Sequence, residues 1–174
     1  PANYASPDVP SLDDAEWQRL AQGRSLWFVH GTFVNTPTAF QAFPPDVLAS
    51  LSDAYGGRVA AIDHHTLGLS PVENADLVRA LVPDRLDLEV DIVCHSRGGL
   101  VSRALAGQGG EPVFNVRRIV HVASANHGTA LATPSNLVPF IDRITTIVNL
   151  IPDGPAALVE ATLTSVLVVV KIIA

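Results

Sequence analysis

The sequence predicts an α/β protein, built as a three-layer α/β/α sandwich around a mostly parallel sheet. Short apolar runs of strand length alternate with helical segments between about residues 25 and 125. This order favours right-handed strand–helix–strand crossovers, which put helices on both faces of a parallel sheet. Hydrophobic residues make up 48% of the 174 residues and charged residues 16%, which is typical of a chain with a packed core.

The chain begins with a predicted short helix and a predicted buried strand. The helix spans residues 11–23, where Ser11 or Asp13 can act as N-cap and Gly23 ends the helical pattern. Residues 25–31 are a continuous apolar run that ends in a glycine. Such a run is typical of a parallel strand that is covered on both faces.

A helical segment and a second strand follow. Apolar residues recur at helical spacing over residues 38–54, although Pro44 and Pro45 must start or break a turn there. The apolar run that ends in two histidines predicts a second strand over residues 57–65.

The second half of the core starts with a helix over residues 70–83. Ser70 can cap this helix, and Pro83 stops it. The remaining predicted elements are a third strand, a helix ended by glycines and a fourth strand, at residues 88–96, 97–110 and 116–125.

The element pattern divides the chain into three parts. Residues 1–24 are a lead-in with the short helix, residues 25–130 are the α/β core, and residues 131–174 are an apolar, proline-broken region that resembles a helical cap or lid. Helical spacing in this last part fits residues 137–150 and 156–174. Charged residues interrupt its final apolar run, which falls short of the ~20 apolar residues of a membrane-spanning helix.

Charge and cysteine content exclude several classes. The net charge of −6 has no basic stripe, which argues against a nucleic-acid partner. Cys94 is the single cysteine, so the chain has no internal disulfide framework. The N-terminus has no signal-peptide pattern; this leaves the compartment open between the cytoplasm, slightly favoured, and secretion after removal of a signal peptide.

Four polar turns with histidines follow the predicted strands, at residues 30–32, 63–65, 95–97 and 126–129. The carboxyl ends of parallel strands lie at one edge of a sheet, and ligands of such sheets bind beyond that edge. The clustering of these four turns therefore predicts a functional site there.

The stretch "DIVCHSRGGLVSRAL" joins an apolar strand to a helix through Ser96. A serine hydroxyl can act as a nucleophile where it projects from a sharp strand-to-helix turn, which needs small neighbours. Gly98 meets that need, and Gly99 lets the helix approach the sheet. The N–H of Arg97 is then expected to face an oxyanion that develops at the reaction site.

Three segments resemble the α/β-hydrolase superfamily, and within it the bacterial lipases and esterases. "CHSRGG" resembles the turn that carries the nucleophile, "WFVHGT" the His-Gly turn after an early strand, and "ASANHGT" the Asn-His-Gly-Thr turn after a later strand. Each follows a predicted strand, in the family's order. The resemblance covers about residues 25–130.

The resemblance implies a role for each matching residue. Ser96 is the nucleophile, and the backbone N–H groups of Thr32 and Arg97 form the oxyanion hole. Gly31 and Gly98 shape the two turns. The apolar C-terminal region resembles a lid over an acyl-binding pocket, which would exclude water and admit an apolar substrate.

Two departures from the family pattern matter. Cys94 stands where the family usually has glycine in the nucleophile turn. The family also supplies its acid and its histidine after the nucleophile, on later strands, whereas this sequence has no histidine after His127. The triad acid and histidine are therefore expected outside the chain, which would be the N-terminal part of the fold.

The sequence thus predicts a serine ester hydrolase that acts by acyl transfer, without cofactor or metal. Its expected partner is a small-molecule or lipid ester, and the remainder of the hydrolase or an oligomer partner is expected to cover the apolar C-terminal region. The main alternative is a non-catalytic module of the same fold that binds an acyl ligand or a protein through that region. A third hypothesis is a cation-dependent hydrolase that uses Asp63, His64 and His65.

Several of these residues can also have a purely structural role. Ser96 can be a helix N-cap, and His30 is expected to be a buried residue that bonds to the backbone. Cys94 is expected to be buried and inert. A triad completed within the chain would use His127 as its base.

Overall fold

The computed structural model describes residues 12–66, 68–83, 86–107 and 114–130, together with residues 133, 135, 136 and 139. The chain divides into two compact units, Pro1–Asn126 and His127–Ala174. The predicted helix over residues 156–174, and nearly all of that over residues 137–150, lie outside the described residues. The same holds for the first residues of the lead-in.

Four strands and five helices are described, all of them in the first unit. The strands are β1 (Ser25–Val29), β2 (Val59–Ile62), β3 (Leu88–His95) and β4 (Phe114–Val122). The helices are α1 (Asp14–Ala21), α2 (Thr36–Phe40), α3 (Pro45–Ala54), α4 (Pro71–Leu81) and α5 (Gly98–Gly107). Every predicted element of the core is present.

Capping signals in the sequence define where the helices begin. Asp13 caps α1 and Ser70 caps α4, each in a capping box with a glutamate three residues later. The predicted segment 38–54 is two helices, because the chain turns before Pro45 and α3 begins there. The first of the two begins earlier than expected, since Asn35 accepts a hydrogen bond from the N–H of Thr38 and caps α2.

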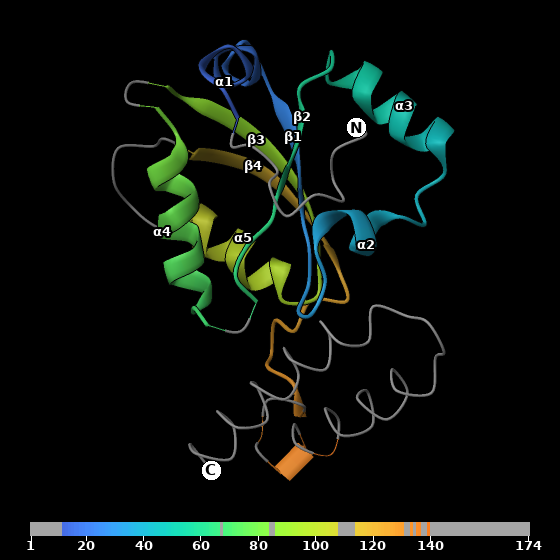
Figure 1. Cartoon of the computed structure of the whole chain (residues 1–174), viewed down its shortest axis with the longest axis vertical. Coiled ribbons are helices and arrows are strands. Elements are labelled where there is room, and N and C mark those ends of the chain that lie inside the picture. Colours follow the sequence, from blue (N-terminus) through green and yellow to red (C-terminus); the bar gives the residue numbers. More distant parts are fainter. Residues whose placement is uncertain are drawn as a thin grey trace, which may run out of the picture. The chain divides into compact units, whose positions relative to one another are not determined.

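All described strands are parallel, in the order β2-β1-β3-β4 (Figure 1). Helices α4 and α5 lie on one side of this sheet, and α2 and α3 lie on the other (Figure 1). The protein is therefore of the α/β class with three layers, as the sequence predicts.

The main core lies on the α4–α5 side of the sheet. Trp27 and Ile92 are cross-strand neighbours on that face and are at most 2% exposed. They belong to one apolar cluster with side chains of α1, α4 and α5. The opposite face is covered partly by aromatic residues, because Phe28 packs edge-on against Phe40 and Phe43, with ring centroids 5.0 and 5.8 Å away.

β4 ends the sheet in the described part of the chain. On the face of β4 that is directed to the α3 side, Val120 is 56% exposed and Val122 is 48% exposed. Among the described strands, β4 is therefore an edge strand with exposed apolar side chains. An edge of this kind invites pairing unless something covers it.

The second unit is described at only a few residues. Thr133 donates a hydrogen bond from its hydroxyl to the carbonyl of Ala130, over 2.8 Å. Gly128 adopts a φ of +81°, a left-handed conformation that suits glycine. Among the helices that the structure describes, none has the length and apolar character needed to cross a membrane.

Candidate functional site

Ser96 occupies a strained corner between β3 and α5. Its φ of +52° lies in the left-handed region, which costs a non-glycine residue of order 1–3 kcal/mol. The corner is fixed on both sides: the Ser96 N–H donates to the carbonyl of Val122 over 2.9 Å, and the Ser96 carbonyl accepts from the Gly99 N–H over 3.1 Å. Strain held in this way is characteristic of functional turns.

The Ser96 side chain does not act as a helix cap. Helix α5 begins at Gly98, so the capping position belongs to Arg97. Within the described residues, the Ser96 hydroxyl has no hydrogen-bond partner, and the side chain is partly exposed. The hydroxyl is therefore available to a ligand.

Backbone strain is concentrated at one edge of the sheet. The described non-glycine residues with positive φ are Phe33, Ser96 and Ala123, at +64°, +52° and +50°. Each follows the carboxyl end of a parallel strand, namely β1, β3 and β4. This is the edge where the histidine-bearing turns were predicted to form a site.

Two glycines bring the turn after β1 against the Ser96 corner. A Cβ atom on Gly98 would lie 2.4 Å from the carbonyl oxygens of both Val29 and His30. A Cβ atom on Gly31 would lie 2.9 Å from the Cβ of Ser96. Only glycine fits at these close approaches, so the predicted roles of both residues in shaping the turns have a steric basis.

Two backbone amides beside Ser96 are free of partners in the described part of the chain. The N–H groups of Thr32 and Arg97 donate to no described residue. These are the two groups that the sequence predicted as oxyanion donors. An unpartnered N–H next to a strained corner is able to bind an anionic or carbonyl oxygen.

His30 and His64 form a stacked pair beneath these turns. Their ring centroids are 4.3 Å apart and the ring planes differ by 4°. The N–H of His64 donates to Nε2 of His30 over 3.1 Å, so the Nδ1–H of His30 donates to the Gly31 carbonyl over 2.8 Å. His30 is therefore a buried residue bonded to the backbone, as expected, and it fixes the carbonyl of Gly31.

The second ring of the pair bonds back to the first. Nε2 of His64 lies 2.9 Å from the His30 carbonyl and donates to it, which leaves Nδ1 of His64 as an acceptor. Burial lowers the pKa of both His30 and His64, because desolvation disfavours the charged imidazolium. Both rings are therefore neutral near pH 7.

The guanidinium of Arg97 completes this network. It lies 3.3 Å from Nδ1 of His64 and donates to the carbonyl of His65 over 3.1 Å. It also donates to the carbonyl of Leu69. One side chain thus connects the Ser96 corner to the turn after β2. Sequence reasoning assigned a role to the Arg97 N–H only and missed its side chain.

Asp63 and His65 do not join His64 in a cation site. Asp63 Oδ1 accepts from the Thr36 N–H over 2.7 Å, and His65 is exposed. The His64 ring nitrogens are engaged by a carbonyl and by Arg97, whose positive charge repels a cation. No group of three or more potential ligands is found among the residues that the structure describes. Although Asp63 Oδ1 is also 3.3 Å from His30 Nε2, the neutral His30 forms no salt bridge with it.

A second serine on the same edge has a histidine partner. The Ser124 hydroxyl lies 3.1 Å from Nδ1 of His121. Cys94, which is fully buried, lies behind this pair with its Sγ 3.4 Å from the same nitrogen. Burial raises the pKa of the Cys94 thiol, so it stays protonated. The segment from His121 to Ser124 has no catalytic signature, and sequence analysis did not identify it.

The fourth predicted turn, residues 126–129, straddles the boundary between the two units. Asn126 belongs to the first unit, where its Oδ1 lies 3.5 Å from Nη1 of Arg103 on α5. His127 belongs to the second unit. The hypothesis that His127 serves as an internal base therefore stays a prediction.

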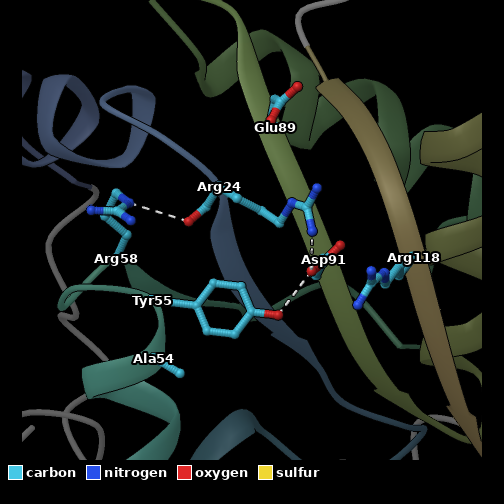
Figure 2. A pocket seen from close by; sticks show the side chains of 7 residues that line it. All are labelled: Arg24, Ala54, Tyr55, Arg58, Glu89, Asp91 and Arg118. Carbon is cyan, nitrogen blue, oxygen red and sulfur yellow. Dashed lines mark hydrogen bonds and ion pairs between the residues drawn. The ribbon is translucent and has the colours of Figure 1, made fainter.

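A shallow pocket of about 500 Å³ lies beside α3, on the face of the sheet opposite to α4 and α5 (Figure 2). Tyr55 and Arg24 converge on Asp91, with the Tyr55 hydroxyl 2.8 Å and Arg24 Nη1 3.7 Å from the same carboxylate oxygen (Figure 2). Burial and the hydrogen bond to Asp91 raise the pKa of Tyr55. Both contacts use Asp91 Oδ2, whereas the buried Oδ1 of the same carboxylate has no hydrogen-bond partner among the described residues.

Comparisons with known proteins place the chain in a family. The search of curated proteins finds no match to this sequence. The model of one protein family, described as "Domain of unknown function (DUF7379)", matches residues 1–174. The match spans the whole chain, and the protein therefore belongs to the DUF7379 family.

Proposed function

We propose that this protein is a serine ester hydrolase of the α/β-hydrolase type, lipase- or esterase-like, with Ser96 as its nucleophile. The observation that carries the proposal is the strained φ of +52° at Ser96 between β3 and α5. This conformation turns the serine out of the strand at the edge where ligands of parallel sheets bind. The unpartnered N–H groups of Thr32 and Arg97 support the same reading.

In the proposed reaction, Ser96 Oγ attacks the ester carbonyl carbon and its proton passes to a general base. The carbonyl oxygen becomes an oxyanion that accepts hydrogen bonds from the N–H groups of Thr32 and Arg97. The tetrahedral intermediate then collapses and expels the alcohol, which takes up the proton from the base. Water attacks the resulting acyl-serine, releases the carboxylic acid and restores the hydroxyl of Ser96.

The alternative is a non-catalytic module of the same fold that binds an acyl ligand or a protein. One observation favours it: among the described residues, no histidine hydrogen-bonds to the Ser96 hydroxyl. A serine without a base is a weak nucleophile. The two functions differ in one measurable property, the reactivity of Ser96.

The test is covalent labelling of the full-length gene product with a fluorophosphonate probe, followed by peptide mapping. The proposal predicts labelling at Ser96 that Ser96→Ala abolishes. Ser124→Ala is the matched control, because Ser124 lies on the same sheet edge and already contacts a histidine. Labelling at Ser124, or no labelling of the folded protein, would reject Ser96 as the nucleophile, and the latter result would favour the binding module.

A further inference from the structure

The side chains of Arg97, His64 and His30 connect three separate segments at the proposed site. Arg97 follows β3, His64 follows β2 and His30 follows β1, and the strand order β2-β1-β3 brings these ends together. The connections are the contacts between Arg97 and His64 at 3.3 Å and between the His64 N–H and His30 at 3.1 Å. The chain of contacts ends on the Gly31 carbonyl, which belongs to the same planar peptide group as the N–H of Thr32.

We propose that the Arg97 guanidinium and the His64 ring are positioning residues that hold the His30–Thr32 turn against Ser96, and that protonation of the histidines releases this turn. The inference rests on the proposed function for its catalytic consequence. It does not rest on that function for the contacts themselves. The turn that is held carries the Thr32 N–H, which the proposed reaction uses as an oxyanion donor.

Geometry explains why the ring of His64 must be neutral. Its Nδ1 faces the cationic guanidinium and accepts from it, so a proton on Nδ1 would put two donors with like charge 3.3 Å apart. His30 is restricted in the same way, because a proton on Nε2 would face the N–H of His64. The surrounding charged or titratable groups are Arg97, Asp63 and His65, of which Asp63 alone would favour a charged His30.

We call the contacts from Arg97 through His64 and His30 to the Gly31 carbonyl the lock. Acidification should weaken it, because each histidine must be neutral to make its contact. Burial keeps the pKa of both rings below the usual histidine value of 6.5, so the release should occur below pH 6.5. Loss of the lock would leave the Thr32 N–H without a fixed direction relative to Ser96. Removal of an oxyanion donor costs about 10²- to 10³-fold in rate, and a mispositioned donor should cost part of that.

The first measurement follows the backbone amide of Thr32 by NMR in the wild-type chain, from about pH 4.5 to 7.5 around the histidine range. We expect its chemical shift to titrate with a midpoint below 6.5. His64→Phe should reduce the amplitude of this titration, because only the His30 ring of the stacked pair then remains to titrate. His65→Phe is the matched control, because it removes an adjacent exposed ring and keeps the backbone carbonyl that Arg97 contacts.

The second measurement is the rate of fluorophosphonate labelling of Ser96 in the full-length gene product. Arg97→Gln should lower the rate by about 10- to 100-fold, and Arg97→Lys should restore part of it, since the charge stays while the fork of donors is lost. Arg103→Gln, which removes an exposed arginine from the same helix, should leave the rate unchanged. Thermal unfolding of each variant verifies that it is folded.

The two measurements separate failure of the lock from failure of the hydrolase proposal. A Thr32 amide that ignores both pH and Arg97→Gln would overturn the lock, whatever the reactivity of Ser96. A Thr32 amide that responds as expected in a protein whose Ser96 is never labelled would support the lock and reject the hydrolase. If His64→Phe does not fold, the wild-type titration alone decides.

Discussion

Replacement of Gly98 by alanine should damage both the fold and the proposed site. The added Cβ atom would lie 2.4 Å from the carbonyl oxygens of Val29 and His30, which are backbone atoms at the end of a central strand. Ordinary contact begins at 3.4 Å, so α5 or β1 must move by about 1 Å. Overpacking of this kind costs about 1–3 kcal/mol, which outweighs the ~0.5–1 kcal/mol that alanine gains over glycine within a helix.

Activity should suffer more than stability. A displacement of about 1 Å at a reacting group can cost about 10²-fold in rate, because the attacking and stabilising atoms lose their alignment. The assay combines urea unfolding with the rate of probe labelling at Ser96. Gly107→Ala at the other end of α5 is the control: its Cβ would meet nothing within 4 Å, so it should preserve or slightly raise stability and leave labelling unchanged. Equal stability and equal labelling of Gly98→Ala and wild type would refute the packing argument.

Three further predictions concern stability. Tyr55→Phe removes a hydrogen bond from the buried carboxylate of Asp91 and should lower the free energy of unfolding by about 1–3 kcal/mol, as measured by urea denaturation; an unchanged midpoint would contradict it. Ser70→Ala removes the cap of α4 and should cost about 1 kcal/mol in the same assay, whereas Ser70→Gly should cost only a few tenths. Stability should also fall as the pH drops below 6.5. In the unfolded chain His30 and His64 then take up protons, whereas in the folded protein their lowered pKa keeps both rings neutral, so acidification favours the unfolded state. His64→Phe should flatten this slope in urea titrations between about pH 5 and pH 8.

Much of the fold follows from local signals in the sequence. Apolar runs that end in glycine or histidine mark β1 and β3, and Ser70 with Glu73 marks the start of α4. The order of the strands does not follow in the same way, because periodicity reports which face of a strand is buried and not which strand lies beside it. The start of α2 was missed for a different reason, since the Asn35 cap precedes any apolar periodicity.

The candidate site also contains residues that local sequence predicts and contacts that depend on the strand order. The Ser96 corner and Gly98 could be predicted, because a strand-to-helix corner needs small residues at fixed spacing, whereas Gly31 was expected only from the resemblance of its turn to the α/β-hydrolases. The stack of His30 on His64 could not, since the two rings come from turns 34 residues apart and meet only because β2 lies beside β1. The direction of the Arg97 side chain was likewise hidden, because a sequence does not tell which turn a long side chain will reach.

The central claim is that Ser96 reacts while the N–H groups of Thr32 and Arg97 face the oxygen that becomes negatively charged. A crystal structure of the protein after reaction with a phosphonate ester tests it directly, since the phosphonyl oxygen mimics the oxyanion. The account predicts a covalent bond from Ser96 Oγ to phosphorus, with that oxygen about 2.7–3.1 Å from both amide nitrogens. A phosphonyl group on another residue, or one on Ser96 whose oxygen is turned away from both amides, would contradict it.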